Sequence, residues 1–294
     1  MKEIVVISGK GGTGKTSITA SFAVLGGSTV IIADCDVDAS DMHVFMKPEP
    51  FHTEDFYSGE YASIDADLCI NCGKCLDVCR FGAVQVIDEH YSINKMDCEG
   101  CGYCTRICPA NAIQNIENHV GWWYISKIKT SSKMVHARMK AGAENSGKLV
   151  AKVKNKARHI AESEGKSFVL IDGSPGIGCP VISSLSGADY VILVSEPTVS
   201  GLHDLKRVYE LVKKFEIPAG CIINKADINR ENWDSLVVFL NENKIDHLAD
   251  LPYDLTFTKA MIEGKSIVEF DNNALKKILT DTWDTFINKL NHSE

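Results

Sequence analysis

The chain has 294 residues, 45% of them hydrophobic and 24% charged, which is enough apolar material for the core of an ordinary globular protein. The net charge of −8 argues against general nucleic-acid binding, and the longest apolar runs, of five residues, are too short to span a membrane. The first residues lack the pattern of a signal peptide. We therefore expect a cytoplasmic protein whose eleven cysteines stay reduced and bind metal rather than form disulfides.

A glycine-rich loop follows the first strand-like run, residues 4–7, and precedes a helix-length segment. Residues 8–16 read SGKGGTGKT and match the pattern G-x-x-x-x-G-K-[ST]. Glycines let backbone N–H groups surround phosphates at a helix N-terminus, while Lys15 neutralises the β/γ-phosphates and Thr16 binds Mg²⁺. The sequence therefore predicts a nucleotide site here, formed by Gly9, Lys10, Gly11, Gly12, Thr13, Gly14, Lys15, Thr16 and Ser17.

Strand-like and helix-like segments alternate along much of the chain. An amphipathic stretch at 202–215, for example, separates two apolar runs. This alternation is typical of a mostly parallel sheet covered by helices on both faces, the architecture of an α/β P-loop NTPase. We predict its strands at 4–7, 30–33, 168–171, 190–194 and 221–223.

Eight cysteines form two runs of identical spacing, C-x2-C-x2-C-x3-C, one from Cys69 to Cys79 and one from Cys98 to Cys108. In bacterial-type ferredoxins with this spacing, the fourth cysteine of each run binds the other cluster. Zinc is the alternative, because Zn²⁺ sites also use four cysteines. We assign Cys69, Cys72, Cys75 and Cys108 to one [4Fe–4S] cluster, and Cys98, Cys101, Cys104 and Cys79 to a second.

The cysteine runs lie between two segments that resemble linkers. Residues 47–60 contain two prolines, a glycine and several acidic residues, and residues 117–119 are a short polar run. We therefore expect a small α+β ferredoxin domain at 61–117. It would be inserted into a discontinuous P-loop ATPase domain made of residues 1–60 and 118–294.

The extra lysine of the loop, Lys10, resembles the deviant Walker A motif of the MinD/ParA/Mrp and nitrogenase-iron-protein ATPases. Residues 34–38, DCDVD, resemble switch I of that family, and residues 168–176 resemble its Walker B strand and switch II. Nearly the whole chain resembles one subgroup, MinD-type ATPases with an inserted ferredoxin domain. The resemblance implies ATP or ADP with Mg²⁺, and a nucleotide-dependent homodimer in which Lys10 reaches the phosphates bound by the partner.

The resemblance also implies individual roles. Asp172 would join Thr16 at the Mg²⁺ ion. Asp36 would orient the attacking water, with Asp38 as the next candidate. Three further residues, Asn224, Lys225 and Asp227, stand where the family contacts the base. Because Asn-Lys-x-Asp could also recognise guanine, GTP remains the alternative to ATP.

Three cysteines and the C-terminus lie outside these motifs. We interpret Cys35 and Cys221 as small core residues. Cys179 is either a plain residue near a dimer interface or part of an intersubunit cluster. The apolar stripe within 275–290 is expected to pack on the body of the domain rather than to bind a membrane.

Three functions follow from this organisation. The first is an ATPase whose nucleotide-driven dimer changes control electron transfer through the two clusters. The second is an ATP-dependent factor that assembles or carries iron–sulfur or other metal clusters. The third is a MinD/ParA-like positioning ATPase with structural clusters. The first two require a redox or cluster-acceptor protein as partner. The third would need a membrane or DNA surface, which neither the C-terminal stripe nor the net charge supplies. We therefore expect no nucleic-acid partner and no stable membrane insertion.

Overall fold

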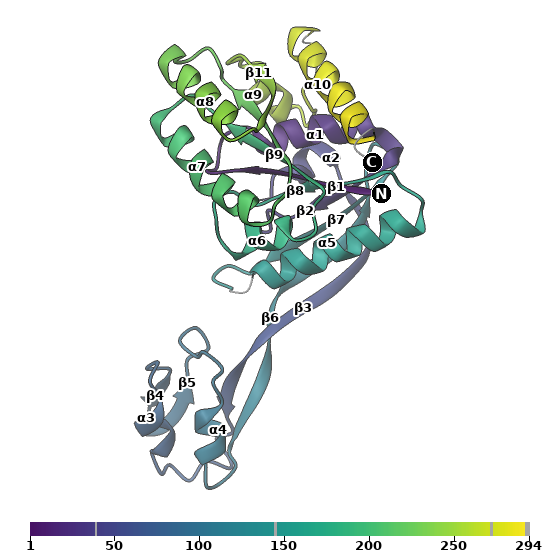
Figure 1. The fold of residues 1–294 in the computed structure, drawn as a ribbon. Helices are drawn as coiled ribbons and strands as arrows, with labels where there is room; N and C mark the ends of the chain where they lie inside the picture. The colour runs from purple at the N-terminus through teal and green to yellow at the C-terminus, as the bar shows by residue number, and fades with distance from the viewer. Residues whose placement is uncertain (39, 144–145, 271–272, 292–294) are drawn as a thin grey trace. The chain divides into compact units, whose positions relative to one another are not determined.

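The computed structural model in Figure 1 describes residues 1–38, 40–143, 146–270 and 273–291. The chain forms two compact units. Unit 1 comprises Met1–Glu54, Trp122–Arg138 and Ser146–Glu294, and unit 2 comprises Asp55–Gly121 and Met139–Asn145. Unit 2 is therefore wider at both ends than the 61–117 expected from the sequence.

A nine-stranded sheet forms the framework. From β11 across to β7, neighbouring strands run parallel. The sheet includes all five strands predicted from the sequence. In order across the sheet the strands are β11 (Asp246–Leu251), β10 (Ala219–Asn224), β9 (Tyr190–Ser195), β1 (Lys2–Ser8), β8 (Phe168–Asp172), β2 (Val30–Asp34), β7 (Lys133–Met139), β6 (Ile113–Lys127) and β3 (Glu49–Ile64).

Helices cover both faces of the parallel strands (Figure 1). Alternate residues of a strand point to opposite faces, so Ile4 and Val6 of β1 join one buried core, together with Phe22 and Trp283 from the helices. On that face lie α1 (Lys15–Gly26), α2 (Met42–Met46) and α10 (Asn273–Asn291). On the other face α5 (Ser146–Ser163), α6 (Cys179–Leu185) and α7 (Val199–Lys214) pack against the sheet. The remaining helical segments of unit 1 are η1 (Gly27–Thr29), α8 (Arg230–Glu242) and α9 (Thr256–Ile262).

The two segments expected to be linkers are instead parts of long strands. Residues 49–60 belong to β3, and residues 117–119 belong to β6, which is its neighbour in the sheet. The linker prediction was wrong because β3 is the last strand of the sheet. A proline and many charged side chains are compatible with such an edge, where one row of backbone groups pairs with no other strand.

Unit 2 is built from short elements around the cysteines. It contains α3 (Lys74–Val78), α4 (Tyr103–Ile107) and an antiparallel pair, β4 (Val84–Ile87) with β5 (His90–Ile93). Its apolar cluster is small and includes cysteine side chains: the buried members are Ala62, Cys75, Val84 and Ile113. A core of this size contributes little apolar burial to the stability of unit 2.

The C-terminal stripe packs on the body of unit 1, as predicted. In α10, residues Leu275, Leu279 and Trp283 are buried in the same core as α1. The Trp283 ring lies 5.2 Å from the ring of Phe22, centroid to centroid. Within the described part of the chain, none of the helices combines the length and hydrophobicity needed to cross a bilayer.

Replacing Trp283 tests this packing. Trp283→Ala removes a side chain that is 6% exposed, and we expect it to lower the free energy of unfolding by about 3–5 kcal/mol, since the cavity left behind collapses only partly. Chemical denaturation gives the value. Ile262→Ala, at a side chain 80% exposed, is the control and should change stability by less than about 0.5 kcal/mol. Equal effects would contradict the packing described.

Candidate functional site

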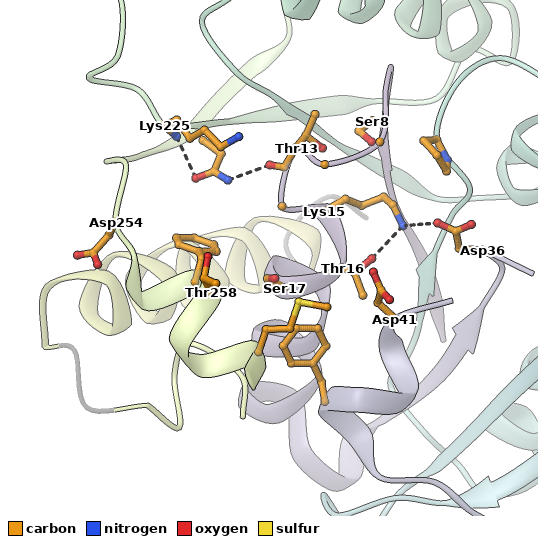
Figure 2. A pocket seen from close by; sticks show the side chains of 18 of the residues that line it. Ser8, Thr13, Lys15, Thr16, Ser17, Asp36, Asp41, Lys225, Asp254 and Thr258 are labelled. Carbon is orange, nitrogen blue, oxygen red and sulfur yellow. Dashed lines mark hydrogen bonds and ion pairs between the residues drawn. The ribbon is translucent and has the colours of Figure 1, made fainter. Parts of the chain in front are cut away.

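A cavity of about 470 Å³ opens where the parallel strands end (Figure 2). This size is ordinary for a small-molecule site, and the carboxyl ends of parallel strands are where such sites form. The loop after β1 supplies one wall, and segments after β2, β8, β10 and β11 supply the others. Lining residues are Ser8, Gly11, Gly12, Thr13, Gly14, Lys15, Thr16, Ser17, Asp36, Asp41, Phe45, Pro175, Asn224, Lys225, Tyr253, Asp254, Phe257, Thr258 and Met261.

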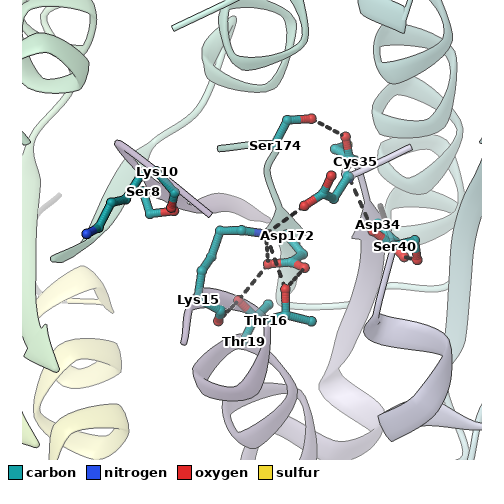
Figure 3. A network of polar contacts seen from close by, with 11 residues as sticks. Ser8, Lys10, Lys15, Thr16, Thr19, Asp34, Cys35, Ser40, Asp172 and Ser174 are labelled. Carbon is teal, nitrogen blue, oxygen red and sulfur yellow. Dashed lines mark hydrogen bonds and ion pairs between the residues drawn. The ribbon is translucent and has the colours of Figure 1, made fainter. Parts of the chain in front are cut away.

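Lys15 is the centre of a buried polar network (Figure 3). Its Nζ lies 2.8 Å from Asp172 Oδ1 and 3.6 Å from Asp36 Oδ2. Thr16 Oγ1 donates to Asp172 Oδ2 at 2.9 Å. Burial alone would lower the pKa of Lys15, but the negative charges of Asp172 and Asp36 outweigh it and raise that pKa. The geometry thus joins a fixed ammonium group to a hydroxyl–carboxylate pair of the kind that binds Mg²⁺ through oxygen.

The two switch-like aspartates are placed differently. Asp36 is buried and lines the cavity, whereas Asp38 is exposed and lies outside the set of described residues that line it. Behind Asp36, Asp34 accepts a hydrogen bond from the Ser40 hydroxyl. Burial and the charge of Asp172 raise the pKa of Asp34 to about 7. Three carboxylates therefore lie near Lys15.

The Asn-Lys-x-Asp segment after β10 contributes two residues to the cavity. Asn224 Nδ2 donates to the Thr13 carbonyl at 2.8 Å, which fixes the glycine-rich loop from the side, and Lys225 lines the same wall. Asp227 lies outside the described lining, and its Oδ1 accepts from the Tyr253 backbone N–H at 2.7 Å. In this structure Asn224 supports the loop and Asp227 supports the segment after β11.

Lys10 and Lys225 share one carboxylate outside the cavity. Glu196, which follows β9, places Oε1 at 2.5 Å from Lys10 Nζ and Oε2 at 2.7 Å from Lys225 Nζ. Burial would raise the pKa of Glu196, but the hydrogen bonds from both lysines lower it. The Lys10 ammonium also donates to the Ser200 hydroxyl at 3.0 Å. Lys10 is therefore held within its own chain, pointing to α7.

Part of the cavity lining is apolar, and the sequence did not predict it. Phe45, Tyr253, Phe257 and Met261 contribute apolar side chains to the lining, together with the carboxylate of Asp254. Phe45 comes from α2, and the others come from α9 and the segment that leads into it. One signal was available in the sequence, since Tyr253 and Asp254 follow a strand at its carboxyl end. No sequence motif marks Phe45 or Met261 as a site residue. Rings and a thioether beside a polar loop suit a flat heterocycle attached to a phosphate chain.

In unit 2 the eight run cysteines surround two separate hollows. Each hollow is small, with a cavity volume of about 20 Å³. The first is lined by Cys69, Cys72, Cys75 and Cys108, and the second by Cys79, Cys98, Cys101 and Cys104. No three His, Cys, Asp or Glu side chains among the described residues are grouped closely enough to bind a single metal ion between them. The cysteines therefore surround a space rather than converge on one point.

Backbone N–H groups point at several of these sulfurs. Ala62 N donates to Cys98 Sγ at 3.4 Å, and Ala112 N donates to Cys108 Sγ at 3.3 Å. Partial burial would raise the pKa of Cys79, but hydrogen bonds from backbone N–H groups of residues 81–84 outweigh it and lower that pKa. Donors of this kind favour the thiolate, which is the form that binds metal.

The other three cysteines lie in unit 1. Cys35 and Cys221 are buried, and burial raises the pKa of both thiols, as expected for small core residues. Cys179 is exposed at the first position of α6, and a Cβ on Gly147 would lie 3.0 Å from its Cβ. α5 and α6 therefore approach each other closely at this point.

Comparison with known proteins agrees with the fold and the loop. The family model for the CobQ/CobB/MinD/ParA nucleotide binding domain matches residues 4–267. An uncharacterized protein of Methanocaldococcus jannaschii is 33% identical, over 96% of this chain and 95% of that protein. An iron–sulfur cluster carrier protein of Pyrococcus horikoshii is 25% identical over 42% of this chain and 46% of its own length.

Solved structures share the fold. The septum site-determining protein MinD of Pyrococcus horikoshii OT3, complexed with Mg-ADP, has a TM-score of 0.60 and 19% identity, covering 99% of this chain and 97% of that one. The cell division ATPase MinD of Pyrococcus furiosus has a TM-score of 0.58 and 18% identity, covering 98% of this chain and 99% of that one.

The support that Asn224 gives to the loop can be tested at Gly14. Gly14 has φ +88°, and a Cβ there would lie 2.4 Å from Asn224 Nδ2. We expect Gly14→Ala to displace the amide and weaken binding of a fluorescent ATP analogue at least about tenfold. Gly27→Ala is the control, because Gly27 also has positive φ but no neighbour within 4 Å of its Cβ position. Unchanged affinity in Gly14→Ala would contradict this account.

Proposed function

Because the chain belongs to the CobQ/CobB/MinD/ParA nucleotide-binding family, we propose that it is an ATP-hydrolysing iron–sulfur protein. In this proposal, nucleotide-driven changes of a homodimer control electron transfer through two [4Fe–4S] clusters held by unit 2. The observation that carries the proposal is the grouping of eight cysteines into two sets of four around separate hollows, with the fourth cysteine of each run in the other set.

The cysteine sets suit cubane clusters better than zinc. A Zn²⁺ ion needs four sulfurs at about 2.3 Å from one point, and no three Cys, His, Asp or Glu side chains among the described residues are grouped closely enough to hold one. Backbone N–H groups at Cys98, Cys108 and Cys79 favour bound thiolates. Bound clusters would supply one-electron chemistry and would also add cross-links to a unit whose apolar core is small.

The cavity in unit 1 suits a nucleoside triphosphate with Mg²⁺. Backbone N–H groups of residues 9–16 would surround the phosphates. The Lys15 ammonium group, now paired with Asp172 and Asp36, would turn to the β/γ-phosphates. Thr16 would bind Mg²⁺ directly, and Asp172 would bind it through a water molecule. The apolar lining residues Tyr253 and Phe257 would contact the base, with ATP favoured by family membership and GTP as the alternative.

Catalysis would use Asp36, which lines the cavity near Lys15, to orient the attacking water. Lys10 would leave Glu196 and reach the phosphates of a second protomer, so that the dimer forms around nucleotide. Charged and hydrogen-bonding groups fixed around the transferred phosphoryl group supply most of the rate enhancement in such sites.

A second candidate function is ATP-dependent assembly or delivery of iron–sulfur clusters to an acceptor protein. The observation that favours it is the similarity to an iron–sulfur cluster carrier protein, which covers 42% of this chain. Four cysteines for each cluster favour retention of clusters over delivery, because a carrier must release its cargo. The two functions differ in whether iron leaves the protein during turnover.

Two aspartate variants test the catalytic assignment. Asp36→Asn removes the buried carboxylate beside Lys15, and we expect ATP hydrolysis to fall at least about 10²-fold while ATP binding persists. Asp38→Asn, at an exposed carboxylate, should stay within about twofold of the unmodified protein. Phosphate release and ATP affinity are the measurements. A stronger effect of Asp38→Asn would transfer the role to Asp38.

Paired cysteine variants test the cluster assignment. The anaerobically purified protein should contain about eight iron and eight labile sulfide atoms per chain. Cys72→Ser/Cys108→Ser alters one set only and should retain about four iron atoms. Cys72→Ser/Cys79→Ser alters both sets and should retain fewer. Equal iron in the two double variants would contradict the exchanged ligation, and stoichiometric zinc without sulfide would overturn the clusters.

A further inference from the structure

The two hollows of unit 2 are related by the internal repeat, yet their walls differ. Several counterpart positions of the two runs carry the same residue in both linings, for example Gly73 and Gly102, or Ala112 and Ala83. Four lining pairs differ in kind: Ile70 with Glu99, Lys74 with Tyr103, Ala110 with Phe81, and Tyr91 with Ala62. The second hollow therefore has two aromatic rings, Phe81 and Tyr103, and the first has one, Tyr91, which is less exposed than either.

Both rings are open to solvent. Phe81 is 49% exposed and Tyr103 is 52% exposed, although each also lines the second hollow. A ring that only covered the hollow would gain most from full burial, at about 25 cal/mol for each Å² of apolar surface removed from water. Half-exposed aromatic side chains are instead typical of residues that a protein partner covers.

The charge of unit 2 indicates the kind of partner. Residues 55–121 contain ten Asp and Glu but four Lys and Arg, a net charge of −6. Glu99 is the charged side chain among the described residues lining the second hollow. Charge of one sign over a small unit steers a partner of opposite sign and repels one of the same sign.

We propose that Phe81 and Tyr103 form the docking face for a one-electron redox protein whose contact surface is apolar at its centre and positively charged around it. This inference rests on the proposed clusters and adds the place where electrons leave or enter unit 2. One electron passes between the two proteins, the donor is oxidised, the acceptor is reduced, and no proton or group is transferred.

Cytochrome c serves as the probe, because it is a basic one-electron acceptor with an apolar haem edge. The protein is reduced with dithionite and desalted anaerobically, so that reduction of ferric haem reports electron transfer from the protein alone. A second measurement, calorimetric titration of the two oxidised proteins, gives the dissociation constant without turnover. Flavodoxin, an acidic redox protein, is the probe of opposite charge.

Phe81→Ala/Tyr103→Ala removes both rings without changing charge, and alanine occupies the counterpart of Phe81 at position 110. We expect the dissociation constant for cytochrome c to rise about tenfold, with a matching fall in second-order rate. Val86→Ala/Ile87→Ala is the matched control. These side chains are 53% and 55% exposed and lie outside the described linings of both hollows, so affinity should be unchanged.

Iron content separates this proposal from the one on which it rests. Unmodified protein without iron would overturn the clusters themselves. If iron is complete but the aromatic variant binds cytochrome c as the unmodified protein does, the docking face is wrong. Tighter binding to flavodoxin than to cytochrome c, or binding to neither, would overturn the stated charge of the partner. If the alanine variant loses iron, Phe81→Leu/Tyr103→Leu keeps apolar contact in the hollow and should still weaken binding.

Discussion

The nucleotide site depends on an ammonium group buried among carboxylates. Lys15 lies at the start of α1, and its charge would be costly to bury unless opposite charges came with it. Asp172, the last residue of β8, and Asp36, in the segment after β2, supply those charges. This pairing of charges is possible because β8 lies between β1 and β2. Val6 of β1 and Asp34 of β2 both lie opposite Asp172 in the sheet. Strand order, loop conformation and site chemistry are thus consequences of one arrangement of charges.

Much of the α/β unit could be predicted from the sequence because its signals are local. Strands buried on both faces, such as residues 190–195, are continuous apolar runs. The loop before Lys15 has a spacing that few other structures require, and α10 has an apolar stripe with the helical period. The cysteine runs are similar, since spacing alone predicted two sets of four, and the structure places those same residues around two hollows.

What the sequence could not provide depends on pairing between distant segments. Residues 49–60 have the composition of a linker, and only the neighbouring strand β6 explains why they are extended. Phe45 of α2 and Met261 of α9 both line the cavity, although neither was predicted as a site residue. The hydrogen bond from the Asn224 amide to the Thr13 carbonyl joins residues more than two hundred positions apart, and no local pattern predicts it.

The continuity of β3 and β6 limits how such a chain can change during evolution. Side chains alternate between the faces of a strand, so one residue inserted into either strand would turn every later side chain of that strand to the opposite face. In β6, Trp123 and Ile125 are buried, whereas Trp122 and Tyr124, which point to the opposite face, are half-buried. Length variation in these strands is therefore tolerated in steps of two residues, or as matched changes in both. A unit joined through paired strands is inherited together with its register, and cannot be exchanged as freely as one joined by loops.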